Sequence, residues 1–179
     1  MRVLFVSSFQ AYCSVEKPLY DQNAIPLGVS YVSAFLKEAG HETRMVVLTP
    51  DTTMRVLDLA IEDFRPGVVG FTSIFSEYEF IRQTAAYIKA KHPHLYLIAG
   101  GPHISLNPEA AIQDAFDAVC IGEGEHPTLE LIGQLEKGQS PDGIMNWNSA
   151  MPSSFLTKIV FSLRVRHKSK EYSHPAFVL

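Results

Sequence analysis

Five short apolar runs, each rich in β-branched residues, alternate along this chain with segments whose apolar residues recur at helical spacing. Short runs of this kind indicate buried strands, and strands that alternate with helices indicate a parallel sheet with right-handed crossovers. We therefore predict an α/β fold with a five-stranded, doubly wound parallel sheet in three layers. The predicted strands are Arg2 to Ser7, Thr43 to Leu48, Gly67 to Thr72, Leu95 to Ala99 and Ala118 to Ile121.

The expected strand order is 2-1-3-4-5, which is that of a flavodoxin-like fold. Pro26 suits the start of the first helix and Gly40 its end. Ser76, with Glu79 three residues later, has the spacing of a capping box and predicts the start of a later helix. The loop Ser8 to Ile25 is long for a connection in such a unit, and loops of this length are often functional.

Size and composition favour one domain followed by a short appended segment. With 179 residues, of which 46% are hydrophobic, the chain is expected to form one buried core. Residues 1–138 carry the predicted βα units and form the expected Rossmann-like binding domain. Residues 139–179 are expected to be a linker and a basic, partly disordered tail, in which Thr157 to Val165 could form one extra strand.

Charge and cysteine content argue against several functional classes. The net charge of −4 argues against a nucleic-acid partner, because such a protein would show a basic face. The two cysteines, Cys13 and Cys120, are far apart and form neither a disulfide framework nor a CxxC metal pair, which fits a cytoplasmic location. No apolar run approaches the ~20 residues that a membrane span needs, so no membrane partner is expected.

Two of the predicted strands end in small and hydroxylated residues, in the segments Gly70 to Ser76 (GFTSIFS) and Leu97 to His103 (LIAGGPH). Parallel strands place their carboxyl ends at the same edge of a sheet, and small residues let a ligand approach the backbone. We therefore expect the two strand ends to form one binding site. A larger side chain at Ser73 or Gly101 should block that site and leave the fold intact.

Four segments, in this order and at this spacing, resemble the amino-terminal cobalamin-binding domain of the cobalamin-dependent radical SAM enzymes. In the wider cobalamin-binding fold, Ser-x-Leu at the end of the third strand is followed by Gly-Gly at an interval similar to that between Thr72-Ser73-Ile74 and Gly100-Gly101. The resembling segments are Ile25 to Glu42 (IPLGVSYVSAFLKEAGHE), Val68 to Ser76 (VVGFTSIFS), Ala99 to His103 (AGGPH) and Asp117 to Glu125 (DAVCIGEGE).

The resemblance implies that cobalamin binds at the carboxyl edge of the sheet. Its corrin ring would lie across this edge, against the long first loop and the start of the helix that follows. The residues implied to form a slot for its nucleotide tail are Thr72, Ser73, Gly100 and Gly101. The other residues implied at the cofactor are Phe9, Gln10, Tyr12, Leu27, Gly28, Ile74, Pro102, His103, Gly122, Glu123 and Gly124.

Some cobalamin domains supply a histidine to cobalt through a DxHxxG motif after the first strand, but Ser7 to Ile25 contains no histidine. The resemblance therefore implies base-off cobalamin without a histidine ligand from this loop, and no metal-ligating residue is expected in the chain. His103 is expected to line the pocket by hydrogen bonding rather than to coordinate cobalt.

In this family the radical chemistry comes from a second domain, whose CxxxCxxC motif holds an iron–sulfur cluster. The chain lacks that motif, so it is expected to bind no cluster and to carry no catalytic residue of its own. Glu123 and Glu125, which resemble an acid–base pair, are expected to complement the dipole of the last helix. The resemblance implies the cofactor module of a radical SAM methyltransferase or cyclase, with the catalytic domain or subunit as a partner.

Two other functions remain as alternatives. A cofactor-free interaction or sensory module could use the same flavodoxin-like fold. A nucleotide-binding enzyme would need GxGxxG after the first strand, and the absence of glycine from Ser7 to Ala11 weighs against it.

Overall fold

The computed structural model describes residues 1–9, 13–14, 17–18, 26–49, 54–141, 143–144 and 147–149. Its main sheet has the strand order β4-β1-β5-β6-β7-β8. The first five strands in this order are parallel and confirm the predicted order 2-1-3-4-5. Their bounds are Glu42–Leu48 (β4), Arg2–Ser8 (β1), Val68–Thr72 (β5), Tyr96–Gly100 (β6) and Ala118–Cys120 (β7).

A sixth strand, which was not predicted, extends the sheet beyond its parallel part. β8 (Trp147–Ser149) pairs antiparallel with β7. It belongs to the segment 139–179 that was predicted as linker and tail, and Ile144 of the same segment is buried against the core. Residues 150–179, with the candidate strand Thr157 to Val165, lie outside the described residues. Within the first loop, β2 (Cys13–Ser14) and β3 (Lys17–Pro18) form a separate antiparallel ladder.

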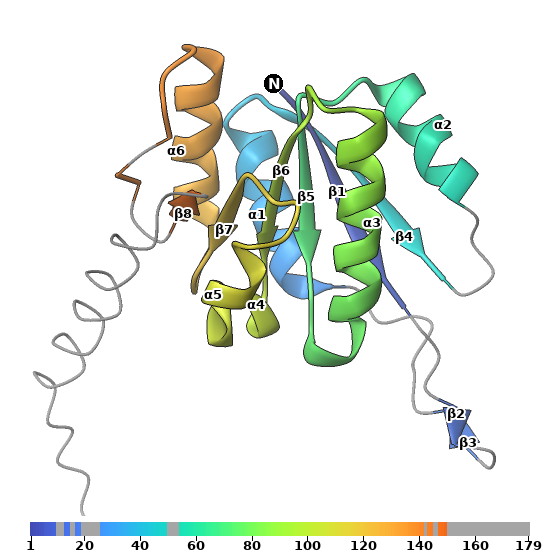
Figure 1. Ribbon diagram of the computed structural model, residues 1–179. Helices are drawn as coiled ribbons and strands as arrows, with labels where there is room; N and C mark the ends of the chain where they lie inside the picture. Colours follow the sequence, from blue (N-terminus) through green and yellow to red (C-terminus); the bar gives the residue numbers. More distant parts are fainter. Residues whose placement is uncertain are drawn as a thin grey trace, which may run out of the picture.

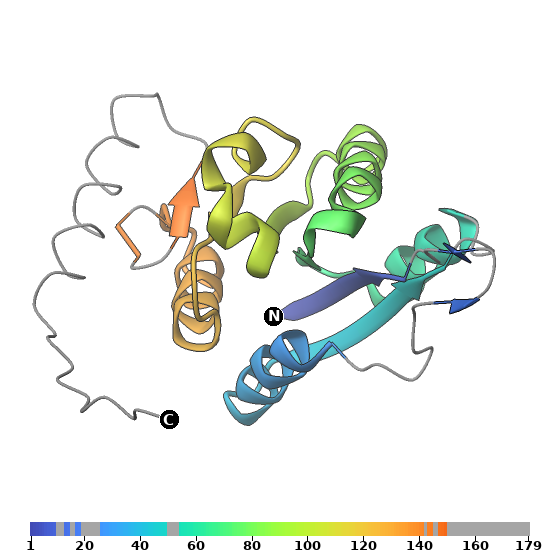
Figure 2. The same ribbon diagram turned by 90° about the horizontal axis from the view of Figure 1, so that it is seen from below.

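Helices cover both faces of the sheet, which gives the expected three layers (Figures 1 and 2). α1 (Leu27–Glu38) and α6 (Glu125–Glu136) pack together on one face, where their buried side chains form a core with β1 and β6. The other face carries a second core under α2 (Met54–Phe64), α3 (Tyr78–Lys91), α4 (Pro102–Leu106) and α5 (Pro108–Ala111). Among the described residues, none of these helices combines the length and the apolar character that crossing a membrane requires.

Two helix starts differ from the predictions. α3 begins at Tyr78, after one turn of 3-10 helix, η1 (Phe75–Glu77), so its N-cap position belongs to Glu77 and the prediction of Ser76 is wrong. Ser76 itself lies in the middle of this 3-10 turn. α4 follows Gly101 directly and was not predicted, because a helix of five residues is too short to show a periodic pattern.

Candidate functional site

The two polar strand ends lie side by side at the carboxyl edge of the sheet, the edge that Figure 2 views. Thr72 of β5 stands opposite Gly100 of β6 in the parallel register. The Ser73 N–H donates to the Gly100 carbonyl over 3.1 Å, and the His103 N–H donates to the Ser73 carbonyl over 3.1 Å. These bonds tie the start of α4 to the end of β5, so the loops after β5 and β6 form one unit.

At Gly101 these two loops approach each other closely. Its φ of 100° and ψ of 176° lie in a region that is essentially restricted to glycine. A Cβ at this position would lie 2.8 Å from Thr72 Oγ1 and 2.9 Å from the Ser73 carbonyl oxygen. The fold itself therefore requires glycine here, and the expectation that a larger side chain would leave the fold intact is wrong.

Ser73 is likewise part of the packing rather than an open surface. Its side chain is buried, and its hydroxyl donates to the Ile74 carbonyl over 2.9 Å. A bulky residue at position 73 would have to displace the chain around it, so the expectation that it could block a site without disturbing the fold is also wrong.

Two glycines at this edge, in contrast, face open space. Gly28 lies in the first turn of α1, and Gly122 follows β7 with a φ of 85°; no heavy atom lies within 4 Å of a Cβ built on either residue. The Gly122 N–H donates to the Ser105 hydroxyl over 3.0 Å, which fixes the loop after β7 to α4. Gly124 differs, because its Cβ would lie 3.4 Å from a methyl group of Val32 on α1. Gly28 and Gly122 thus offer backbone that a broad, flat ligand can reach.

Several large apolar side chains around this edge are exposed. On α1, Leu27 is 68% and Tyr31 is 66% exposed. Phe75 in η1 and Leu106 at the end of α4 are 83% and 81% exposed, and Ile74 before η1 is also exposed. They lie near the starts of α1 and α3 and at the end of α4, which are the elements that border the carboxyl edge.

His103, the imidazole expected in the site, lies on α4 beside two aromatic side chains. Its ring centroid is 4.3 Å from that of Tyr78 and 5.6 Å from that of Phe75. In the part of the chain that the structure describes, no three His, Cys, Asp or Glu side chains are grouped so that they could hold a metal ion. The ring of His103 is thus in contact with two aromatic rings.

The remaining predicted site residues are more dispersed. Phe9 is half-buried just after β1, and its N–H donates to the Leu48 carbonyl over 2.8 Å. Pro102 is the exposed first residue of α4, and Glu123 is exposed before α6. Gln10 and Tyr12 lie outside the described residues.

Cys120 is the last residue of β7, and Glu123 lies in the loop that follows. Burial, followed by the nearby charges of Glu125 and Glu123, raises the pKa of its thiol to about 12. The thiol is therefore protonated at neutral pH and packs as a small buried hydrophobic side chain. Its Sγ approaches the Glu123 carbonyl at 3.7 Å.

Glu77 is a buried carboxylate at this edge that sequence reasoning missed. It is 7% exposed, and it accepts a hydrogen bond of 2.7 Å from the hydroxyl of Ser8 at the end of β1. The bond joins the end of β1 to the residue just before α3, which follows β5. Strands β1 and β5 are neighbours in the sheet. An acidic residue just before a helix only weakly indicates a buried carboxylate, because most such residues are exposed.

We expect the change of Glu77 to alanine to lower stability, because it leaves the buried Ser8 hydroxyl without this acceptor. The typical cost is about 1–3 kcal/mol, or several degrees of melting temperature at this chain length. Glu77→Gln keeps an acceptor oxygen and should lose less. Glu79→Ala, which removes an exposed carboxylate of the same helix, is the control for thermal unfolding. Equal melting temperatures for Glu77→Ala and Glu79→Ala would contradict this role of Glu77.

Comparison with known proteins places the chain in a family. Residues 20–132 match the family model of the B12 binding domain. An uncharacterized methyltransferase of Pyrococcus horikoshii is 31% identical over 123 residues, which are 67% of this chain and 27% of that protein. The anaerobic magnesium-protoporphyrin IX monomethyl ester cyclase of Rubrivivax gelatinosus is 26% identical over 118 residues, 64% of this chain and 21% of the cyclase. The chain thus spans roughly a quarter of the length of these relatives.

Among solved structures, the fold is similar to part of the cobalamin-dependent S-adenosylmethionine radical enzyme OxsB with aqua-cobalamin and S-adenosylmethionine bound. The TM-score is 0.67 at 18% sequence identity, and the match covers 85% of this chain and 21% of that enzyme. At this identity the similarity concerns the fold. It agrees with the parallel sheet and the strand order described above.

Proposed function

The chain belongs to the B12-binding domain family, as the resemblance in its sequence predicted, and from this we propose that it binds cobalamin at the carboxyl edge of its sheet. The observation that carries the proposal is the open backbone at Gly28 and Gly122 beside exposed apolar side chains. A broad corrin ring can lie close to backbone that carries no Cβ, and apolar side chains can cover its surface. Bound cobalamin would supply a cobalt ion that can carry a methyl group or exchange electrons.

Thr72 and Gly100 are proposed to hold the nucleotide tail of the cofactor. The two residues face one another across β5 and β6, and both are partly exposed at the strand ends. A Cβ at Gly100 would meet Cys120 Cβ at 3.5 Å, an ordinary contact, so packing within the chain does not require glycine there. A different reason for glycine at position 100 is that a ligand can approach the backbone closely there. The Thr72 hydroxyl can offer a hydrogen bond to the polar part of the tail.

We propose further that the cofactor is bound base-off. The loop from Ser7 to Ile25 contains no histidine that could replace the displaced base. The ring of His103 lies beside those of Tyr78 and Phe75, which suits a side chain that lines the site better than one that ligates cobalt. The expected result is a base-off absorbance spectrum after the protein is mixed with hydroxocobalamin and separated by gel filtration.

The same mixing and gel-filtration experiment, together with thermal unfolding, tests the whole proposal. Co-elution of cobalamin with the protein and a raised melting temperature are expected, because a ligand that binds only the folded state stabilises it. A base-on spectrum of the bound cofactor would overturn the base-off mode alone. Elution of all cofactor as free hydroxocobalamin would contradict cobalamin binding and favour a cofactor-free interaction module.

The proposed role is that of a cofactor module that presents cobalamin to a radical SAM catalytic domain, as in a methyltransferase or a cyclase. The similarity to a methyltransferase, to a cyclase and to part of a radical enzyme supports this role. The sequence contains no CxxxCxxC motif for an iron–sulfur cluster. We therefore expect the chain, loaded with cobalamin and reduced, to leave S-adenosylmethionine intact unless a protein that carries such a cluster is added.

A further inference from the structure

The His103 imidazole is held by its ring contacts and not by its nitrogen atoms. Within the described residues, neither ring nitrogen has a hydrogen-bond partner, although the backbone carbonyl of His103 accepts bonds from Asn107. The side chain is half-buried at the carboxyl edge, with the Tyr78 and Phe75 rings beside it. Its orientation therefore depends on these neighbours, and its ring N–H remains able to bind a ligand.

Tyr78, the nearer of the two rings, is itself anchored. Its hydroxyl donates a short hydrogen bond to Asp114, and both side chains are partly buried. Burial, and then the neighbouring Asp114 carboxylate, raise the pKa of Tyr78 above its usual value. The hydroxyl therefore stays protonated and remains a donor throughout the neutral range.

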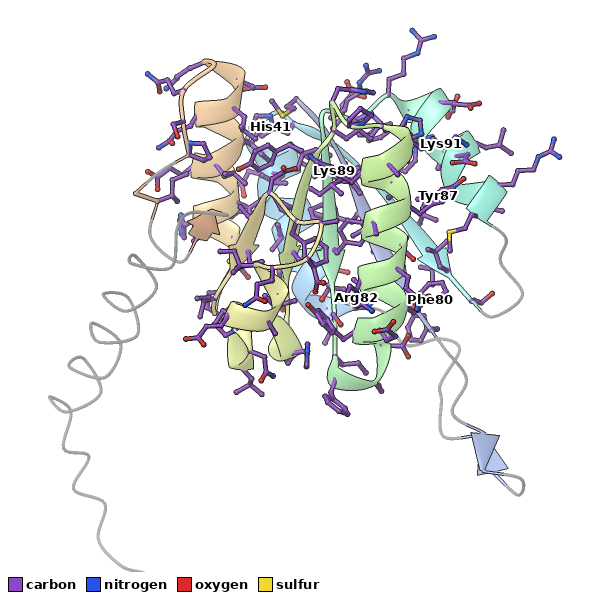
Figure 3. All side chains as sticks on the ribbon, in the orientation of Figure 1. His41, Phe80, Arg82, Tyr87, Lys89 and Lys91 are labelled. Atoms are coloured by element: carbon purple, nitrogen blue, oxygen red, sulfur yellow. The ribbon has the colours of Figure 1, made fainter. Side chains whose placement is uncertain are left out.

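Asp114 is in turn held from two sides. Its N–H donates to the Ala111 carbonyl at the end of α5, and its carboxylate lies 3.8 Å from the Arg82 guanidinium. Arg82 also binds Glu79 one turn earlier, at 2.8 and 3.1 Å. Figure 3 shows Arg82 in the part of α3 that faces α4 and α5. The chain of contacts thus runs from α5 through α3 to the imidazole on α4.

We propose that Asp114 and Tyr78 are positioning residues that orient the His103 imidazole to donate a hydrogen bond to an acceptor oxygen of the bound cofactor. This inference rests on the proposed binding of cobalamin. A neutral imidazole has one N–H donor, so its use depends on the orientation of the ring. Cobalamin offers acceptor oxygens in two places: the phosphate and ribose of its nucleotide tail, and the amide carbonyls of its corrin side chains.

Binding of hydroxocobalamin by single and double variants measures the coupling. His103→Ala should weaken binding up to about tenfold, the worth of one net hydrogen bond, and leave the cobalt spectrum unchanged. Tyr78→Phe keeps the ring but removes its anchor, and should weaken binding about threefold. In the double variant the second change should add nothing, because Tyr78 acts through His103.

Tyr87→Phe is the matched control. The Tyr87 hydroxyl also donates to a carboxylate, that of Asp58, over 2.8 Å. Tyr87 lies on α3, as Tyr78 does, but on the side of this helix away from α4 (Figure 3). Tyr78→Phe and Tyr87→Phe should lower the melting temperature to a similar extent, but only the first should weaken binding. If the two variants bind hydroxocobalamin equally, the proposal is overturned.

A second measurement needs no cofactor. In the ligand-free protein, the NMR signals of the His103 ring should shift in Tyr78→Phe and Asp114→Asn and stay in place in Tyr87→Phe. Unchanged signals in the first two variants would refute the positioning role even if the wild-type chain does not bind cobalamin. If the chain binds no cobalamin but the signals shift, the proposed function fails and the donor role fails with it, while the orienting contact stands.

Cobinamide, which lacks the nucleotide tail, identifies the acceptor. A loss of affinity in His103→Ala for both cobinamide and cobalamin would support a corrin amide as the acceptor, and a loss for cobalamin alone would support the nucleotide tail. Wild-type affinity of His103→Ala for both ligands would overturn the hydrogen bond.

Discussion

Replacement of Gly28 by leucine is expected to weaken cobalamin binding by more than about a hundredfold while the fold stays at least as stable as the wild type. Gly28 is an exposed residue in the first turn of α1, and a Cβ built on it meets no heavy atom within 4 Å. Leucine has the higher helix propensity, by up to about 0.5–1 kcal/mol, so the free energy of unfolding should not fall. A side chain here would fill the space proposed for the corrin ring, and about 3 kcal/mol of lost contact corresponds to that change in affinity.

Gly133→Leu is the control for this prediction. Gly133 is also a helical glycine, on α6, and a Cβ there likewise meets nothing within 4 Å. It lies in the last turns of α6, away from the carboxyl edge, so cobalamin affinity should not change. Equilibrium titration with hydroxocobalamin and thermal unfolding of both variants separate binding from stability. Wild-type affinity in Gly28→Leu would mean that the cofactor does not lie over the start of α1.

Gly101→Ala should destabilise the fold by about 3 kcal/mol or more, through two effects that add. The backbone region of Gly101 costs other residues about 1–3 kcal/mol, and forcing extra atoms into packed surroundings costs about 1–3 kcal/mol more. The atoms that a Cβ would meet belong to Thr72 and to the backbone of Ser73, which cannot move without breaking the bonds between the two loops. At this chain length we expect the melting temperature to fall by roughly 6–12 °C.

Gly138→Ala separates the two effects. Gly138 also has a positive φ, of 64°, but a Cβ there meets no heavy atom within 4 Å. Its replacement should therefore cost the conformational strain alone, about 1–2 kcal/mol. Thermal unfolding of the two variants side by side would measure the difference. If Gly101→Ala were no less stable than Gly138→Ala, the close contact with the end of β5 would not contribute to stability.

The five parallel strands were predictable because each is a short β-branched run between helices of clear period. Val68 to Phe71 and Leu97 to Ala99, for example, are buried on both faces of the sheet, so their residues are apolar without interruption. The order of the strands followed from the analogy with flavodoxin-like folds and not from any one residue. β8 escaped prediction because three residues at an edge carry too little pattern, and its pairing with β7 is a long-range contact.

The sequence by itself determined that the ends of β5 and β6 meet, because parallel strands must place Thr72 and Gly100 at the same edge. Only the tertiary structure decided which glycine serves the fold and which faces solvent. Gly101 lies against Ser73, whereas Gly28 and Gly122 face open space. All three positions are glycine, so the residue type alone does not distinguish them. The physical reason is that local pattern records propensity and burial, while close contacts arise between segments that only the folded chain brings together.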